Sequence, residues 1–223
     1  MCNYSNLLIL FFTFAIEFFP RFMDQLTQQI IHSASAKFQQ FGIRSISIDD
    51  ICNELRFSKK TFYQIFPKKE DLVKAVLEFQ TSLVTEKFMK MYRNKNAIDA
   101  LILIIKEVKL HAHNDCTSFN YDLEKYYPSI YNDYMKHKTD WMKESFMNNL
   151  RQGIEEGYYR EDLDIELSAI YHVVQLSNSY RDILNHSPKI PVKRITEFYI
   201  DMIVRLITNE KGLKYVQEQI MKD

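Results

Sequence analysis

This chain of 223 residues is poor in glycine and proline, with four of the first and five of the second. So few turn-forming residues argue against a β-sandwich and against the glycine-rich loop that binds a dinucleotide. An excess of charge is also absent, because 29 basic residues balance 29 acidic ones. The whole chain therefore gives no electrostatic argument for a nucleic-acid partner, and any such argument depends on where the charges lie.

Cysteine is scarce as well. The three cysteines, Cys2, Cys52 and Cys116, are odd in number and far apart. They are typical of free thiols in a reducing cytosol rather than of a disulfide framework, so we expect a cytoplasmic protein. Hydrophobic residues make up 46% of the chain, which is enough for a packed core and argues against disorder.

Residues 1–23 form an apolar extension. Its central stretch, LLILFFTFAIEFF at residues 7–19, is 13 residues long and contains Glu17. A membrane-spanning helix needs about 20 residues, and the stretch has no preceding lysine or arginine of the kind that starts a signal peptide. We interpret residues 1–22 as upstream sequence translated in error or as a non-essential extension. The alternative is a short interfacial or membrane-associated segment.

Helical periodicity begins at residue 24. Ile30, Ala34 and Phe38 recur at steps of four, which places them on one face of a helix. Gly42 follows at the position where a helix commonly ends in a left-handed cap. The sequence therefore predicts an amphipathic helix that ends at this glycine.

Two short helices should follow. Ser47 and Ser58 each precede a helical pattern, and serine is a favoured N-cap. Only Arg56 and Phe57 separate the two patterns. So short a connection makes two helices cross steeply, and the sequence predicts a helix-turn-helix at residues 47–66.

The rest of the chain, residues 85–223, reads as longer helices. ALILIIKEV lies within a predicted helix from 96 to about 114, and a second begins at Pro128 and ends near GIEEGYYREDLD, residues 153–164. A final pair covers about 166–185 and 192–208. We therefore predict an all-α fold with a three-helix N-terminal domain at residues 24–84 and a helical domain at 85–223.

Basic charge is concentrated near the N-terminus. Residues 24–69 contain seven lysines and arginines against four acids. The stretch SKKTFYQIF, residues 58–66, combines two lysines with aromatic residues. With Phe62 facing inward, Lys59, Lys60, Tyr63 and Gln64 are left on the outward face. A helix with cations and amides on its exposed face suits the major groove of DNA.

We expect this helix to divide its contacts between bases and phosphates. Lys59 and Lys60 can reach a guanine edge or phosphates, and Gln64 can read adenine. The hydroxyls of Thr61 and Tyr63 can donate to phosphates. The alternatives are a solvated helix start for the lysines and a purely packing role for Tyr63.

Helix starts add further candidate phosphate contacts. The amides that follow Ser47 and those near Lys69 should provide positive potential for the DNA backbone. Lys68 is either a phosphate contact or a solvent-facing side chain. These residues complete the candidate DNA-binding surface.

At these positions the sequence resembles the TetR family of bacterial transcriptional regulators. The matching residues are Ser47, Ile48, Ile51, Cys52, Ser58, Thr61, Phe62, Tyr63, Phe66, Lys69, Glu70, Asp71 and Leu72. Two positions depart from the family pattern. Arg56 stands where the family usually has glycine, which predicts backbone strain in the turn, and Cys52 replaces the usual alanine.

The resemblance implies a non-enzymatic repressor that binds a palindromic operator as a homodimer and releases it on binding a small effector. It implies no cofactor. The apolar residues expected in the dimer interface are Leu167, Ile170, Val174, Phe198 and Met202. The residues expected near an effector pocket are His111, Phe119, Tyr121, Tyr126 and Trp141, although such aromatic side chains are often ordinary core.

Other functional classes have weaker support. His111 and Asp115 share one helix face, but no further ligand completes a metal shell, so we predict no metal site. A helical enzyme is the main alternative, yet the sequence shows no nucleophile with its base and no phosphate-binding loop. A membrane-tethered regulator that uses the apolar extension is the second alternative.

Overall fold

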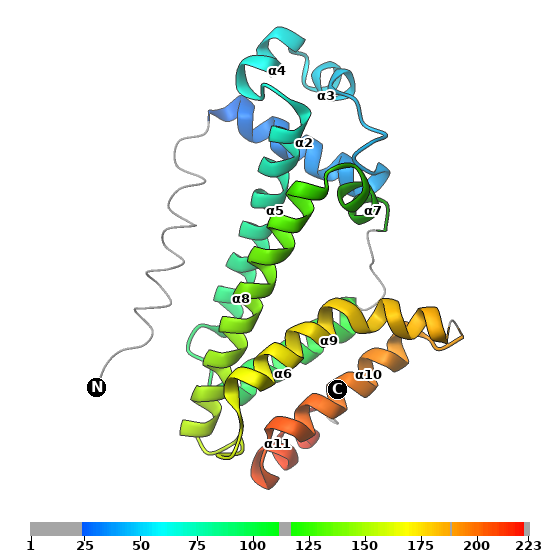
Figure 1. The fold of residues 1–223 in the computed structure, drawn as a ribbon. Helices are drawn as coiled ribbons and strands as arrows, with labels where there is room; N and C mark the ends of the chain where they lie inside the picture. Colours follow the sequence, from blue (N-terminus) through cyan, green and yellow to red (C-terminus); the bar gives the residue numbers. More distant parts are fainter. Residues whose placement is uncertain (1–23, 112–116, 188, 221–223) are drawn as a thin grey trace. The chain divides into compact units, whose positions relative to one another are not determined.

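A computed structural model of the chain describes residues 24–111, 117–187 and 189–220. Over these residues the protein forms ten α-helices, α2 to α11, and no β-strand, which confirms the all-α prediction (Figure 1). The helices divide between two compact units. The head unit contains residues 24–89 and 117–134, and the body unit contains the other described residues, 90–111, 135–187 and 189–220. Within the described residues, every helix is too short or too polar to cross a membrane.

The head unit starts with the three predicted helices. They are α2 (Gln25–Phe41), α3 (Ile48–Leu55) and α4 (Lys59–Ile65). Ser47 and Ser58 accept hydrogen bonds from the third amide of α3 and of α4, so both serine caps are confirmed. Gly42 ends α2 with a φ of 84°, a conformation that glycine adopts without a steric penalty.

The turn between α3 and α4 contains the expected strain. Arg56 adopts the left-handed conformation, with φ 57° and ψ 45°. Its amide donates to the carbonyl of Cys52, which closes the end of α3. In the left-handed conformation the Cβ atom of any residue other than glycine lies too close to the following carbonyl oxygen. The arginine at position 56, where the family usually has glycine, therefore carries a conformational cost.

The rest of the head unit comes from later in the chain. It includes α5 (Lys69–Tyr92) as far as Met89, α7 (Thr117–Tyr126) and the first residues of α8 (Pro128–Glu155). Phe119 and Leu123 of α7 lie in the same core as Phe38 and Phe62. The head unit therefore differs from the expected domain at 24–84, because α7 packs against α2 rather than within the body.

The body unit contains the remaining helices. They are α6 (Ala97–His111), the rest of α8, α9 (Ile165–His186), α10 (Val192–Ile207) and α11 (Glu210–Ile220). Asp164 caps α9 by accepting the Leu167 amide at 2.9 Å. Helix α11 was not expected from the sequence.

A short clasp joins α11 to the loop between α8 and α9. Tyr159 and Thr208 form an antiparallel bridge, and the Asn209 amide donates to the Tyr158 carbonyl at 3.1 Å. A Cβ atom at Gly212 would lie 2.1 Å from that same carbonyl oxygen. Glycine is therefore required for α11 to approach the loop so closely.

Candidate DNA-binding surface of the head unit

The recognition candidate α4 has one buried and one exposed face. Phe62 is fully buried, and its ring contacts Tyr63 edge-on and Phe66 at centroid distances of 5.4 and 5.7 Å. Lys59, Lys60 and Gln64 are exposed, and Tyr63 is 49% exposed. The aromatic layer thus fixes the helix while its cations, amide and phenol face solvent.

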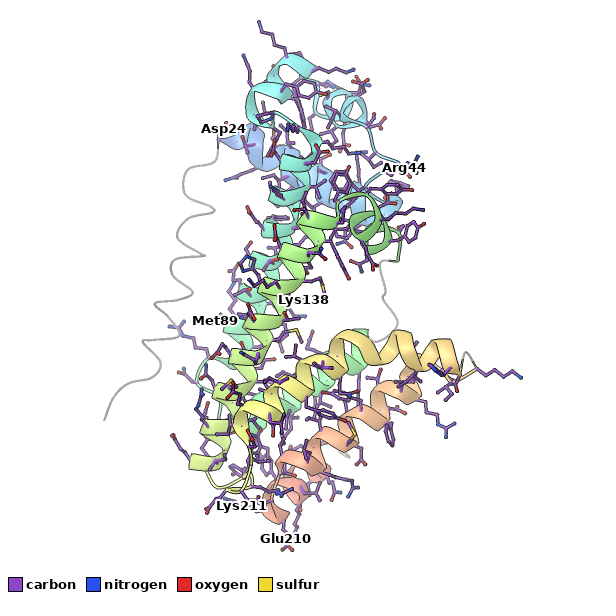
Figure 2. All side chains as sticks on the ribbon, viewed as in Figure 1. Asp24, Arg44, Met89, Lys138, Glu210 and Lys211 are labelled. Atoms are coloured by element: carbon purple, nitrogen blue, oxygen red, sulfur yellow. The ribbon has the colours of Figure 1, made fainter. Side chains whose placement is uncertain are left out.

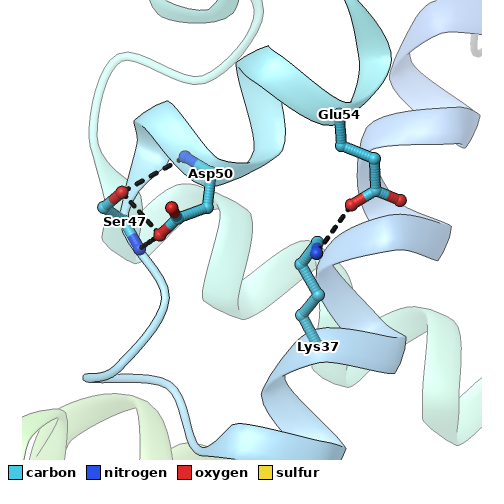
Figure 3. Close-up of polar contacts among 4 residues, drawn as sticks. All are labelled: Lys37, Ser47, Asp50 and Glu54. Atoms are coloured by element: carbon cyan, nitrogen blue, oxygen red, sulfur yellow. Dashed lines mark hydrogen bonds and ion pairs between the residues drawn. The ribbon is translucent and has the colours of Figure 1, made fainter.

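The start of α3 is already occupied by its own side chains. The Ser47 amide and hydroxyl both donate to Oδ2 of Asp50, at 2.7 and 2.6 Å (Figure 3). The Asp50 amide donates back to the Ser47 hydroxyl at 3.2 Å, which completes a capping box. These hydrogen bonds lower the pKa of Asp50. The expected positive end of α3 is therefore partly neutralised by its own carboxylates.

Each end of α3 also makes an ion pair with a neighbouring helix. Lys59 of α4 pairs with Asp49 at 2.8 Å. Lys37 of α2 pairs with Glu54 at 2.7 Å, as Figure 3 shows. All four side chains remain at least a quarter exposed, so each pair contributes little to stability. The pair with α4 matters more for DNA, because it engages one of the predicted contact residues.

Thr61 has a local role besides its predicted one. Its hydroxyl lies 2.9 Å from the Ser58 hydroxyl, and its amide donates to the same oxygen at 3.1 Å. Thr61 is half-buried, whereas Lys68, at the start of α5, is exposed. Local capping therefore holds the Thr61 hydroxyl at the start of α4, on the candidate surface.

Lys69 lies differently from the expectation. Its ammonium donates to the carbonyl of Ile43 at 2.7 Å and to that of Ile46, both in the connection between α2 and α3. The ammonium also lies 5.8 Å from the ring centroid of Phe38. Burial lowers the pKa of Lys69, against the opposing charges of Asp122 and other acids. The structure therefore gives this lysine a role inside the head unit, where it holds a connection whose carbonyls lack helical partners.

The sequence comparison decides the family. The family described as bacterial regulatory proteins, tetR family, matches residues 30–76, from the middle of α2 to the first turns of α5. This match places residues 30–76 in the TetR family of bacterial regulators. The matched stretch lies entirely within the head unit and identifies the protein as a DNA-binding transcriptional regulator.

Relatives of this TetR-family chain match over most of its length. The HTH-type transcriptional repressor KstR2 of Mycobacterium tuberculosis is 20% identical over 188 residues, which is 82% of this chain and 92% of that protein. A transcriptional regulator from Cytophaga hutchinsonii superposes with a TM-score of 0.70 at 17% identity, over 83% of this chain and all of that one. A regulator from Saccharomonospora viridis in complex with choline gives 0.66 at 18% identity, over 84% and 100%. These structures share the fold of the TetR-family chain.

The residues expected near an effector pocket are dispersed in the TetR-family structure. Phe119 is only 4% exposed and belongs to the core of the head unit. Tyr121 and Tyr126 are exposed on the head unit. Trp141 is half-buried in the body unit, while the side chain of His111 lies outside the described part of the chain, as does Asp115. The prediction of a ligand cage built from the aromatic run is therefore unsupported for the three α7 residues.

Sequence reasoning missed the role of α7 in the head unit. The buried carboxylate of Asp122 accepts the Arg44 amide at 2.8 Å, in the connection between α2 and α3. Arg44, labelled in Figure 2, also donates to the Tyr126 hydroxyl, and its guanidinium lies 4.7 Å from that ring centroid. A Cβ atom at Gly42 would lie 2.8 Å from Asp122. Nothing in the sequence spacing of these residues, 78 positions apart for the Arg44 bond, signals this contact.

The residues expected in a dimer interface are exposed or partly exposed on α9 and α10. On α9, Leu167, Ile170 and Val174 are 62%, 40% and 47% exposed. On α10, Phe198 is 71% exposed and Met202 is half-buried. Spacings of three and four residues place the α9 side chains on one stripe. This TetR-family body unit thus presents an apolar surface on both helices.

Proposed function

We propose that this protein is a ligand-responsive repressor that binds a palindromic operator as a homodimer and is released by a small-molecule effector. The observation that carries the proposal is the exposed surface of α4, which carries Lys59, Lys60, Tyr63 and Gln64 while Phe62 is buried. Such a face suits the major groove. A protein with this function acts on the chromosome, and we place it in the bacterial cytoplasm.

The exposed side chains divide by chemistry. We assign Lys60 and Gln64 to base edges, because ammonium and amide groups match the acceptors and donors of guanine and adenine. We assign the hydroxyls of Tyr63 and Thr61, together with Lys68, to phosphates. Ser47 and Lys69 support the surface through the contacts described above.

The homodimer follows from geometry and from the apolar face of the body unit. A single head covers few base pairs, so useful affinity requires two copies about one helical turn apart, roughly 34–36 Å. We propose that the stripes on α9 and α10 of two copies pack together in a four-helix arrangement. Leu167 and Phe198, the most exposed of these side chains, are the natural centre of that interface.

We place the effector in the body unit, where Trp141 is half-buried. The regulator solved in complex with choline supports a small-molecule signal without identifying this one, and the repressor KstR2 supports repression. Trp141 and His111 remain candidates for the pocket. The effector can shift the DNA-binding equilibrium only by the ratio of its affinities for the two states.

The test uses the purified full chain and short duplexes with randomised centres. The wild type should enrich a palindromic sequence, and binding should weaken steeply with salt. Lys59→Ala with Lys60→Ala should abolish this binding while helix content and the dimer persist. The matched control, Lys211→Ala with Lys214→Ala, removes the same charge from exposed positions on α11 and should bind normally. Enrichment of no sequence, or normal binding by the α4 variant, would refute the proposal.

A further inference from the structure

The ion pair between α3 and α4 lies on the surface that faces DNA in the proposed function. Asp49 is the second residue of α3 and Lys59 is the first residue of α4. Their Oδ1 and Nζ atoms are 2.8 Å apart, and their side chains are 52% and 59% exposed. A carboxylate at this place is costly for phosphate binding, because it cancels one cation of the recognition helix and repels the DNA backbone.

The two charged groups together match one base-pair edge. In the major groove a G·C pair presents two acceptors on guanine, N7 and O6, beside a donor on cytosine, the N4 amino group. An ammonium has three donors and no acceptor, and an ionised carboxylate only accepts. With one N–H on Asp49, Lys59 retains two donors for guanine, while the second oxygen of Asp49 can accept from cytosine.

The same pair mismatches the other base pairs. An A·T pair places the thymine O4 acceptor and the C5-methyl group where the carboxylate requires a donor. A reversed C·G pair places the amino group opposite the ammonium. Lysine alone is a flexible, strongly hydrated point charge with little geometric preference. The carboxylate therefore lets the pair distinguish G·C from A·T and from C·G, which Lys59 alone does not do.

We propose that Asp49 and Lys59 act as one unit that reads a G·C base pair in each operator half-site. This assignment rests on the proposed function, since it requires α4 to enter the major groove. It makes Asp49 a specificity-determining residue outside the recognition helix. Because the Asp49 carboxylate repels the DNA backbone, it also lowers the affinity for DNA of unrelated sequence.

The Lys37–Glu54 pair supplies a matched control. It also joins α3 to a neighbouring helix, at 2.7 Å, but its lysine comes from α2 instead of α4. Asp49→Asn and Glu54→Gln each remove one negative charge from α3 and one ion pair. Only the first should change which base pair is preferred.

The experiment begins with the duplex that the wild type enriches from a randomised pool, followed by versions in which each G·C pair is replaced by A·T. At one position per half-site, the wild type should lose about tenfold in affinity, and Asp49→Asn should lose much less. Asp49→Asn should also bind an unrelated duplex more tightly than the wild type does. Lys59→Gln should lose the same preference, and Glu54→Gln should keep it.

The outcomes separate this inference from the function beneath it. If the wild type enriches no duplex, operator binding itself is refuted. If the wild type enriches a duplex and Asp49→Asn discriminates at every position as strongly as the wild type, only the reading role of Asp49 is overturned. Circular dichroism and thermal unfolding of each variant establish that the comparison is made on folded protein.

Discussion

Replacement of Lys69 by methionine should destabilise the head unit. Methionine retains the length and the apolar stem of lysine but has no donor. The change leaves the carbonyls of Ile43 and Ile46 without the ammonium that they share in the structure. Both residues are buried, at 0% and 8% exposure, so water has limited access to the connection.

The size of the effect follows from two opposing contributions. Each buried carbonyl that loses its donor costs about 1–3 kcal/mol. The lowered pKa of Lys69 shows that burial disfavours its charged form, so removal of the charge offsets part of this loss. We expect a net decrease of about 2 kcal/mol in the free energy of unfolding. For a chain of this length, that decrease lowers Tm by about 4–8 °C.

Two measurements distinguish this role from the phosphate contact that the sequence suggested. Thermal or urea unfolding at fixed protein concentration reports the stability, and the salt dependence of DNA binding reports ionic contacts. Lys68→Met changes the exposed neighbour and should leave stability within about 0.5 kcal/mol. An unchanged Tm for Lys69→Met, combined with a salt slope lower by about one unit, would show that Lys69 binds phosphate and refute the structural role.

Two further predictions concern the turn and the body core. Arg56→Gly should raise the free energy of unfolding by about 0.5–1 kcal/mol, because relief of the left-handed strain exceeds the cost of the added entropy of the unfolded chain. Asn94→Gly, at a position with φ 61°, should gain less when both variants are unfolded in urea. His172 hydrogen-bonds to the Tyr199 hydroxyl, and burial lowers its pKa to about 4. As the pH falls, His172 is therefore protonated in the unfolded chain before it is protonated in the folded protein. The free energy of unfolding should decrease by up to about 3 kcal/mol as the pH drops from 6.5 toward 4. His172→Gln should flatten that profile in urea titrations, exposed His137→Gln should not, and an unchanged slope in His172→Gln would contradict this origin.

Local chemistry explains why the helix-turn-helix could be read from the sequence. Ser47, Ser58 and Gly42 act on amides and backbone angles within a few residues of themselves. Phe62 could be assigned to the buried face because Phe66, one helical turn later, is also apolar and lies on the same face. The strain at Arg56 was predictable for the same reason, since the length of the turn and the missing glycine both lie in one short segment.

Long-range packing explains what could not be read. The apolar spacing of Phe119 and Leu123 predicts a helix face but does not say which helix it meets, and their partners lie on α2. The identity of residue 69 as lysine does not reveal whether its ammonium binds a phosphate or a backbone carbonyl. The need for glycine at position 212 within α11 also depends on a distant contact, because a Cβ atom there would collide with the Tyr158 carbonyl.

The membership of α7 in the head unit has a consequence for recombination. The DNA-binding half is assembled from two stretches of chain, residues 24–89 and 117–134, with α6 encoded between them. A single crossover at the end of α5 would deliver a head whose α2 lacks the covering side chains Phe119 and Leu123. Chimaeras that exchange the body unit among relatives therefore need α2 and α7 from the same parent. A double crossover achieves this, as does grafting a compatible α7 surface.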